Sequence, residues 1–245
     1  MTSAIPSMKE LRELNRKEYY SKFQEKMHVL MLYVTWPLLK TTITPNQITV
    51  FWIILQIIAA AFMMFGVYYL NVIGVLLYTF AMLLDYVDGQ IARVKKKHSF
   101  KGIFLEEIGI YTGSPLFILG LSWGVTHSTG DLRYFLLGIT ASLCFLYSKL
   151  LVVNPLSYSE EKRAKLLEVG RLVTTRSKNK KLAWLAFLFR RSQPLNVLFF
   201  GILFNLTPYV VIIYTILYFL ELLRRLYLQF RFLHKLDKGR EEQQN

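Results

Sequence analysis

The stretch LLDYVDGQIARVKKKHSFKGIFLEEIGIY, residues 83–111, places two aspartates, an arginine and two glutamates inside or beside apolar segments. Placing an isolated charge in a hydrocarbon environment costs several kcal/mol of free energy. Acidic residues in such a place therefore indicate a functional site. The rest of the sequence has to show what kind of chain carries that site.

The composition is that of a protein that folds largely in a lipid bilayer. The 245 residues are 53% hydrophobic, with a mean hydropathy of +0.33, and we expect one membrane domain over residues 1–245. Cys144 is the single cysteine, so one chain can form neither a disulfide nor a thiolate metal site, and we expect it to pack in the core. The first 28 residues are charged throughout, unlike a secretory signal.

The apolar segments predict an all-α integral membrane protein with six transmembrane helices. A span needs about 20 apolar residues. Four candidates are residues 49–69, residues 72–84 with a helical continuation into the acidic stretch, residues 103–125 and residues 134–153. Residues 195–223 are too long for one span and are interrupted by NLTPY, so we interpret them as two helices joined at Thr207 and Pro208.

The segment before the first span predicts an amphipathic helix on the membrane surface. Residues 28–39 are apolar, but they number only about a dozen and include Pro37, which favours an interfacial helix over a span. The predicted organisation follows from these segments. It consists of a cytosolic or interfacial segment 1–46, a bundle 47–228 with a basic loop 154–193, and a cytosolic tail 229–245.

The positive charges predict the orientation. All but two of the 30 lysines and arginines lie in residues 1–46, 91–101, 154–193 and 224–245, which six spans place on one side of the membrane. Basic loops favour the cytoplasmic side. We therefore expect a cytoplasmic (inner) membrane of the bacterial type, with both termini and the acidic stretch on the cytoplasmic side. The net charge of +14 then suits anionic lipid, and we expect no nucleic-acid partner.

The acidic stretch has the chemistry of a metal and phosphate site. Asp85 and Asp88 are three residues apart, so a helix places both carboxylates on one face, where they suit Mg²⁺ or Mn²⁺. Gly89 leaves the helix surface open to a bulky ligand. Arg93, one turn further along, can bind a phosphate, and Glu106 of the following helix can add a third oxygen ligand. Such a site suits phosphoryl-group transfer.

The spacing of these residues resembles the signature of the CDP-alcohol phosphotransferase family, which is Asp, two residues, Asp-Gly, two residues, Ala-Arg, eight residues, Gly, three residues, Asp, three residues, Asp. The matching residues are Asp85, Asp88, Gly89, Ala92, Arg93 and Gly102. The segment TPNQIT, with Pro45, Asn46 and Thr49, resembles a second family element at the start of the first span, and Ser99 also matches. Taken by themselves, these residues predict a helix that begins at an Asn46 N-cap, with Pro45 closing the preceding turn.

The resemblance implies a fold, a reaction and a set of roles. The fold has six spans after an interfacial helix, in a homodimer within the lipid bilayer. The reaction transfers a phospho-alcohol group from a CDP-alcohol donor to the hydroxyl of an alcohol acceptor and releases CMP, in phospholipid or related phosphodiester synthesis. The metal, implied as two Mg²⁺ or Mn²⁺ ions, would be held by Asp85, Asp88 and Glu106. The CDP pocket would be lined by Asn46, Thr49, Gly89, Ala92, Arg93, Ser99 and Gly102.

The end of the signature departs from the family. Glu106 replaces the third aspartate and keeps an oxygen ligand, whereas Ile110 replaces the fourth, the family's expected base, and cannot take a proton. Glu107 is a candidate base, although it lies about 60° around the helix axis from residue 110, and we slightly prefer the alternative in which Glu107 faces solvent or the lipid headgroups. The acceptor can also be an acidic alcohol that needs no base. Otherwise the chain binds a CDP-alcohol or metal as a scaffold without turnover.

Two further hypotheses complete the set. Lys149, near the cytoplasmic end of the fourth span, can bind an anionic acceptor or simply extend its ammonium to the lipid headgroups. A small ion or solute transporter is the third function class, but transporters place their acids near the bilayer midplane on broken helices. The acids here cluster at the cytoplasmic mouth, which favours the enzyme.

Overall fold

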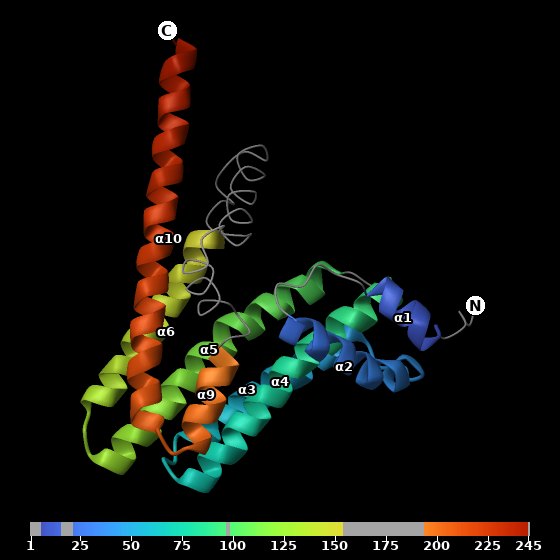
Figure 1. The fold of residues 1–245 in the computed structure, drawn as a ribbon, viewed down its shortest axis with the longest axis horizontal. Coiled ribbons are helices and arrows are strands. Elements are labelled where there is room, and N and C mark those ends of the chain that lie inside the picture. Colours follow the sequence, from blue (N-terminus) through green and yellow to red (C-terminus); the bar gives the residue numbers. More distant parts are fainter. Residues whose placement is uncertain (1–5, 16–21, 97–98, 154–193, 245) are drawn as a thin grey trace. The chain divides into compact units, whose positions relative to one another are not determined.

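The computed structural model describes residues 6–15, 22–96, 99–153 and 194–244, and the regular structure in these ranges is entirely α-helical (Figure 1). The chain divides into two compact units, Met1–Gly124 and Val125–Asn245. The helices of the first unit are α1 (Met8–Leu14), α2 (Lys22–Leu39), α3 (Pro45–Met63), α4 (Tyr68–Val94) and most of α5 (Phe100–Thr129). Those of the second are α6 (Arg133–Val153), α9 (Pro194–Leu203) and α10 (Thr207–Gln244).

Four helices are long and apolar enough to cross a membrane, namely α3, α4, α5 and α6, and the chain is an integral membrane protein. They correspond to the four single spans predicted above. The boundary between the first two was wrong: α3 ends at Met63 and Tyr68 already belongs to α4, because Gly66 takes a left-handed φ of 67° that turns the chain. Helix α9 has 10 residues in the described chain, fewer than the ~20 of a span. The fifth and sixth spans therefore stay a prediction.

Helix α3 begins two residues earlier than expected. Thr44, not Asn46, is its N-cap: the Thr44 side chain accepts from the backbone N–H of Gln47, and the Gln47 side chain accepts from the backbone N–H of Thr44. This reciprocal capping box satisfies two backbone donors. Pro45 suits the first helical turn because proline lacks a backbone N–H, and an N–H at this position would have no partner within the helix. Asn46 is therefore not the N-cap of α3.

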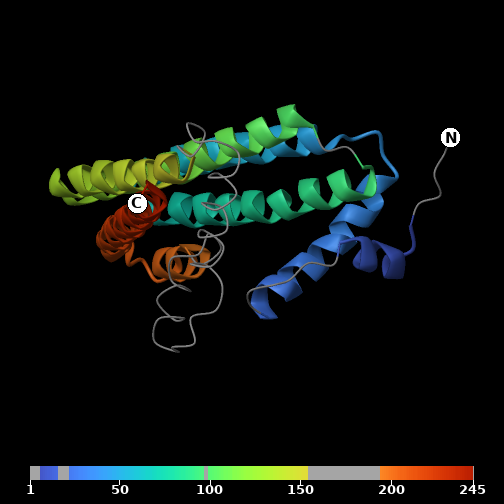
Figure 2. The same ribbon diagram turned by 90° about the horizontal axis from the view of Figure 1, so that it is seen from above.

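Helix α2 is longer than the predicted interfacial segment, because it begins at Lys22 and has 18 residues. One face packs on the first unit and buries His28, Met31, Leu32 and Thr35. Gln90 of α4, itself fully buried, donates to the backbone oxygen of His28 and accepts from the hydroxyl of Thr35. This amide fastens α2 across α4 (Figure 2). The location of α2 on a membrane surface stays a prediction.

Helices α3 and α5 approach each other closely at four glycines of α5. A Cβ atom added at Gly109 would lie 2.0 Å from the Trp52 ring, and one at Gly113 would lie 1.6 Å from the side-chain oxygen of Gln56. At Gly120 and Gly124 the added atom would meet backbone oxygens of α3, at 2.4 Å and 2.0 Å. The two pairs have the Gly-x-x-x-Gly spacing that brings membrane helices together. Glycine thereby sets the distance between α3 and α5.

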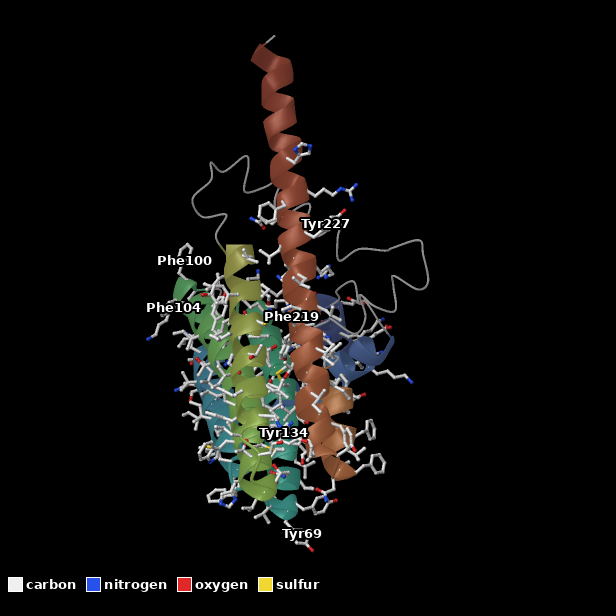
Figure 3. All side chains as sticks on the ribbon, turned by 90° about the vertical axis from the view of Figure 1, so that its left-hand side faces the viewer. Tyr69, Phe100, Phe104, Tyr134, Phe219 and Tyr227 are labelled. Carbon is white, nitrogen blue, oxygen red and sulfur yellow. The ribbon has the colours of Figure 1, made fainter. Side chains whose placement is uncertain are left out.

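Exposed aromatic side chains mark both ends of the helices of the first unit. Figure 3 shows Tyr69, near the start of α4, at one end, and Phe100 and Phe104, near the start of α5, at the other. These side chains are 75%, 94% and 65% exposed. Aromatic residues are typical of the two membrane–water interfaces, so the spans between them lie in the hydrocarbon layer.

The second unit pairs α6 with the long helix α10. The predicted break between two helices is confirmed, but the turn lies before Thr207 and Pro208 and not at them: α9 ends at Leu203, Asn205 takes a left-handed φ of 56°, and α10 already starts at Thr207. The N–H of Leu206 donates to Gly201 O and that of Asn205 to Ile202 O, the two bonds of a Schellman turn. Towards the other end of α6, Arg225 of α10 donates to the backbone oxygen of Ser148.

Candidate active site

Asp88 is the most enclosed carboxylate of the acidic stretch, because its residue is 9% exposed. Two donors of α3 point to the same oxygen of Asp88. The hydroxyl of Thr49 donates to Oδ2 at 2.7 Å, and the indole N–H of Trp52 donates to Oδ2 at 2.8 Å. Thr49 and Trp52 are three residues apart and therefore share a face of α3. Both donors are neutral, so they stabilise the carboxylate without cancelling its charge.

The two other predicted metal ligands, Asp85 and Glu106, are less buried than Asp88. Asp85 is half-buried one turn earlier on α4, and Glu106 is exposed on α5, and both interact electrostatically with Asp88. In the part of the chain that the structure describes, no three His, Cys, Asp or Glu side chains form a compact metal-binding group. The donor set still fits a hard cation, because it consists of carboxylate oxygens and Asp88 meets only neutral donors in α3. A metal centre at these residues stays a prediction.

Arg93 lies over Gly89 on α4. A Cβ atom added at Gly89 would be 3.5 Å and 3.8 Å from the two terminal nitrogens of the Arg93 guanidinium, which is ordinary van der Waals contact. The Nε–H of Arg93 donates to the side-chain oxygen of Asn15 at 2.8 Å. The surface at Gly89, predicted to be open, is therefore bordered by a cation one turn further along α4, an arrangement that suits a phosphate.

Three residues of the predicted CDP pocket meet where α3 and α5 begin. The side-chain oxygen of Asn46 lies 2.9 Å, and the hydroxyl oxygen of Ser99 3.2 Å, from the place that a Cβ on Gly102 would take. Ser99 also caps α5, because its hydroxyl accepts from the backbone N–H of Gly102 at 3.0 Å. Any larger side chain at position 102 would displace Asn46. The structure thus brings Asn46 to Ser99 and Gly102, from which it is far apart in the sequence.

The remaining predicted residues are placed as follows. Ala92 is half-buried beside Arg93, and Ile110 is half-buried on α5 immediately after Gly109. Glu107 is exposed, and its carboxylate interacts with the hydroxyl of Tyr111, one turn further along α5. Lys149 belongs to the second unit, where its ammonium lies 5.4 Å from the ring centroid of Phe145. The roles predicted for Glu107 and Lys149 stay predictions.

Sequence reasoning missed Trp52 and Asn15. The spacing of Trp52 from Thr49 was visible, but a tryptophan in an apolar span is usually core packing, and its link to Asp88 depends on how α3 and α4 pair. Nothing in the sequence indicated a role for Asn15, because it lies in a polar segment 78 residues before Arg93. Their contribution became apparent only from the packing of α1, α3 and α4.

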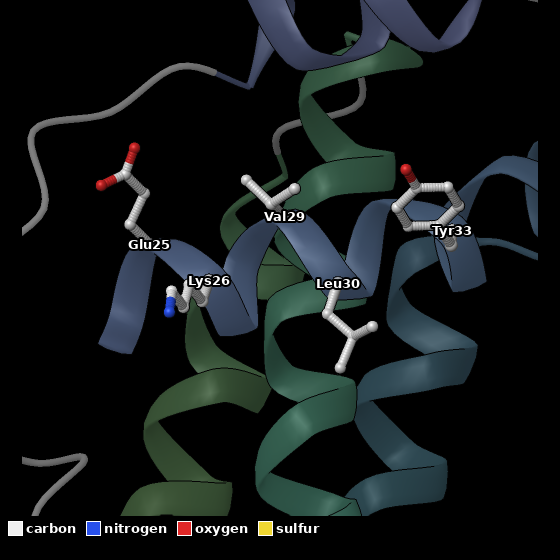
Figure 4. A pocket seen from close by; sticks show the side chains of 5 residues that line it. All are labelled: Glu25, Lys26, Val29, Leu30 and Tyr33. Atoms are coloured by element: carbon white, nitrogen blue, oxygen red, sulfur yellow. The ribbon is translucent and has the colours of Figure 1, made fainter. Parts of the chain in front are cut away.

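A shallow hollow lies elsewhere in the first unit, along the outer face of α2. It is lined by Glu25, Lys26, Val29, Leu30 and Tyr33 (Figure 4). These residues lie on the side of α2 away from the buried His28 and Thr35, which contact α4 through Gln90. The hollow is therefore separate from the carboxylates of the acidic stretch.

The comparisons with known proteins agree with this geometry. A family model described as CDP-alcohol phosphatidyltransferase matches residues 42–222, which include the acidic stretch and all four membrane-spanning helices. No curated protein sequence matches the chain. The family match covers well over half of the 245 residues and includes Asn46, Asp88 and Arg93. The chain therefore belongs to the CDP-alcohol phosphatidyltransferase family.

Proposed function

We propose that this protein transfers a phospho-alcohol group from a CDP-alcohol to the hydroxyl of an acceptor, in phospholipid or related phosphodiester synthesis. The acceptor oxygen forms a bond to the phosphorus next to the donor's alcohol, the bond from that phosphorus to CMP breaks, and the acceptor proton is released. The observation that carries the proposal is Asp88, a buried carboxylate that accepts from two neutral donors and is followed by Gly89, over which the guanidinium of Arg93 lies.

Each group of residues has a proposed task. Asp88 accepts both α3 donors on Oδ2, so its Oδ1 is the oxygen that it would offer to Mg²⁺ or Mn²⁺, together with Asp85 and Glu106. Such an ion would neutralise the pyrophosphate and the charge that develops on the departing CMP. Arg93 binds a donor phosphate over Gly89. Asn46 and Ser99 shape the cytidine end of the pocket against Gly102.

The orientation and assembly belong to the same proposal. We infer that the acidic stretch and both termini face the cytoplasm, because all but two of the basic residues lie in the segments on that side. A homodimer is inferred from the family alone. Two interpretations of Lys149 remain: its ammonium extends to the lipid headgroups, or it binds an anionic acceptor alcohol.

A direct assay tests the reaction. Purified full-length protein in lipid nanodiscs is given a panel of CDP-alcohols and acceptor alcohols, and CMP release is measured with and without Mg²⁺. We expect release that needs both Mg²⁺ and an acceptor, and that Asp88→Asn removes. Release that is equal in the variant, or that needs no divalent metal, would contradict the assignment of the site.

The alternative is a family member that binds the donor without turnover, and Ile110 favours it because isoleucine cannot serve as a base. Ile110→Asp separates the two functions. If the base is simply missing, the new carboxylate raises CMP release by up to about 10²-fold. If Ile110 instead shapes the acceptor pocket of an adapted enzyme, the substitution lowers release and leaves CDP binding unchanged.

A further inference from the structure

The short helix α1 contacts the arginine of the acidic stretch through a single amide. Asn15 ends α1 and is 1% exposed. Its Nδ2 donates to the backbone oxygen of Leu11 at 3.0 Å, and its Oδ1 accepts from Nε of Arg93 at 2.8 Å. A flipped amide would place NH₂ against the guanidinium and an oxygen against a carbonyl. The two bonds therefore fix both the amide and the direction of the arginine.

Other contacts hold α1 in place. Leu11 is fully buried, and the indole N–H of Trp36 in α2 donates to the backbone oxygen of Pro6 at 3.3 Å. Helix α2 is in turn fastened to α4 by Gln90. Helix α1 contacts α4, and Figure 1 shows it beside the end of α4 that carries Arg93. Asn15 is thus presented to Arg93 by a packed scaffold.

The chemistry of the contact suits a cation that must bind an anion. Asn15 bonds to Nε, at the inner corner of the guanidinium, whereas the two terminal nitrogens lie over Gly89. A guanidinium binds phosphate with parallel N–H groups of its fork, so its direction matters. An asparagine adds no charge, so it orients Arg93 without neutralising it, which an aspartate at the same position would do.

We propose that Asn15 is a positioning residue that holds Arg93 over Gly89 for a phosphate of the nucleotide donor. The proposal rests on the proposed function, because it takes Arg93 as the phosphate ligand. It extends the donor site to α1, which lies before the residues 42–222 that the family model matches. Asn15 itself does not contact the donor.

The test measures nucleotide affinity of the full-length protein in detergent with Mg²⁺, by calorimetry. Asn15→Ala is expected to weaken the affinity for CDP about five- to tenfold, which is the usual size of the interaction energy between contacting residues. The affinity for cytidine, which has no phosphate and is measured by competition, is expected not to change. Asn15→Asp keeps an acceptor for Nε but neutralises the cation, and is expected to weaken CDP at least as much. Glu13→Gln, at an exposed position of the same helix, is the control and is expected to leave CDP affinity unchanged.

A double-mutant cycle separates positioning from a general structural effect. In an Arg93→Ala background, Asn15→Ala is expected to cause no further loss of CDP affinity, since the residue that it positions is gone. Additive losses, equal weakening of cytidine, or an unchanged affinity in both Asn15 variants would overturn the positioning role while the wild type still binds CDP. A wild type that does not bind CDP would instead overturn the proposed function, and the positioning role with it.

Discussion

Each unit of the molecule contains a buried carboxylate at a helix contact, and the two are treated in opposite ways. Asp88 in the first unit receives the hydroxyl of Thr49 and the indole N–H of Trp52, both neutral. Glu221 in the second unit, with 7% of its side chain exposed, forms ion pairs with Arg224 and Arg225. Arg225 also donates to the backbone oxygen of Ser148, which links α10 to α6.

The difference separates a carboxylate that is available to a cation from one that already has its cations. Neutral donors stabilise an ionised carboxylate but leave its negative charge in place. Two guanidiniums cancel that charge and use both oxygens of Glu221. Burial alone therefore does not mark a functional acid in this protein. The charge of its partners does, and substitutions at the two sites should have opposite consequences.

The largest expected effect is the loss of activity in Asp88→Asn. Asparagine still accepts from Thr49 and Trp52 but removes the charge that would hold a metal. Changes to groups that merely orient metal ligands cost about 10- to 100-fold, so loss of a ligand should cost about 10²-fold or more in CMP release. Without metal, the melting temperature should stay the same or rise. An Asp88→Asn variant with a lower melting temperature and unchanged activity would show that Asp88, like Glu221, serves stability and not function.

Glu221→Gln should do the opposite and destabilise the protein. The two guanidiniums, with 32% and 25% of their side chains exposed, would lose their counterion. Removing one partner of a buried pair costs about 3–5 kcal/mol, and partial exposure reduces this to about 2 kcal/mol. Thermal unfolding in detergent measures the change, and Mg²⁺-dependent stabilisation by CDP serves as the control. Loss of that stabilisation in a folded variant would mean that Glu221 also serves the donor site.

The contribution of the neutral donors can be measured with Thr49→Val and Thr49→Ser. Valine keeps the shape of threonine but removes the bond to Asp88, whereas serine keeps the hydroxyl. Residues that hydrogen-bond a metal ligand affect how tightly it binds the metal. Thr49→Val should therefore weaken the affinity for Mg²⁺ by about tenfold, and Thr49→Ser should weaken it by much less. Calorimetric titration of Mg²⁺ in the presence of CDP gives both values. Equal affinities of the two variants would show that the hydroxyl does not support Asp88.

The smallest effect belongs to the surface pair Asp131 and Arg133 at the start of α6. Hydrogen bonds from Arg133 lower the pKa of Asp131 below its ordinary 3.8, so the stabilisation is present at neutral pH and lost as the pH falls through the lowered pKa. Arg133→Gln should leave the melting temperature at pH 7 almost unchanged, because exposed pairs are screened by water and salt. A clear drop at pH 7 that disappears at pH 3 would show that this pair matters more than its exposure indicates.

Much of the fold followed from the sequence. Apolar length located α3 to α6, and the NLTPY interruption located the turn before α10, because proline and a left-handed asparagine break a helix in recognisable ways. Helix boundaries were less predictable. Thr44 and Asn46 are both good caps, and only the reciprocal bond with Gln47 decides for Thr44.

The candidate site was predictable in its ligands but not in their support. The spacing of Asp85, Asp88, Gly89 and Arg93 depends only on helical periodicity, which the sequence contains. The contacts of Asp88 with Trp52, and of Arg93 with Asn15, join residues 36 and 78 positions apart. Such pairs depend on how helices pack, and one sequence does not specify the packing.

The bonds of Asp88 also have a direction along the chain, which matters during synthesis. Thr49 and Trp52 precede Asp88, so the helix that supplies both donors is made first. Chains emerge at about 5–20 residues per second, so α3 is available for some seconds before Asp88 leaves the ribosome. When α4 enters the bilayer, its aspartate therefore meets its donors at once, and does not wait for α5. The order of translation thus makes both donors available as soon as α4 packs against α3.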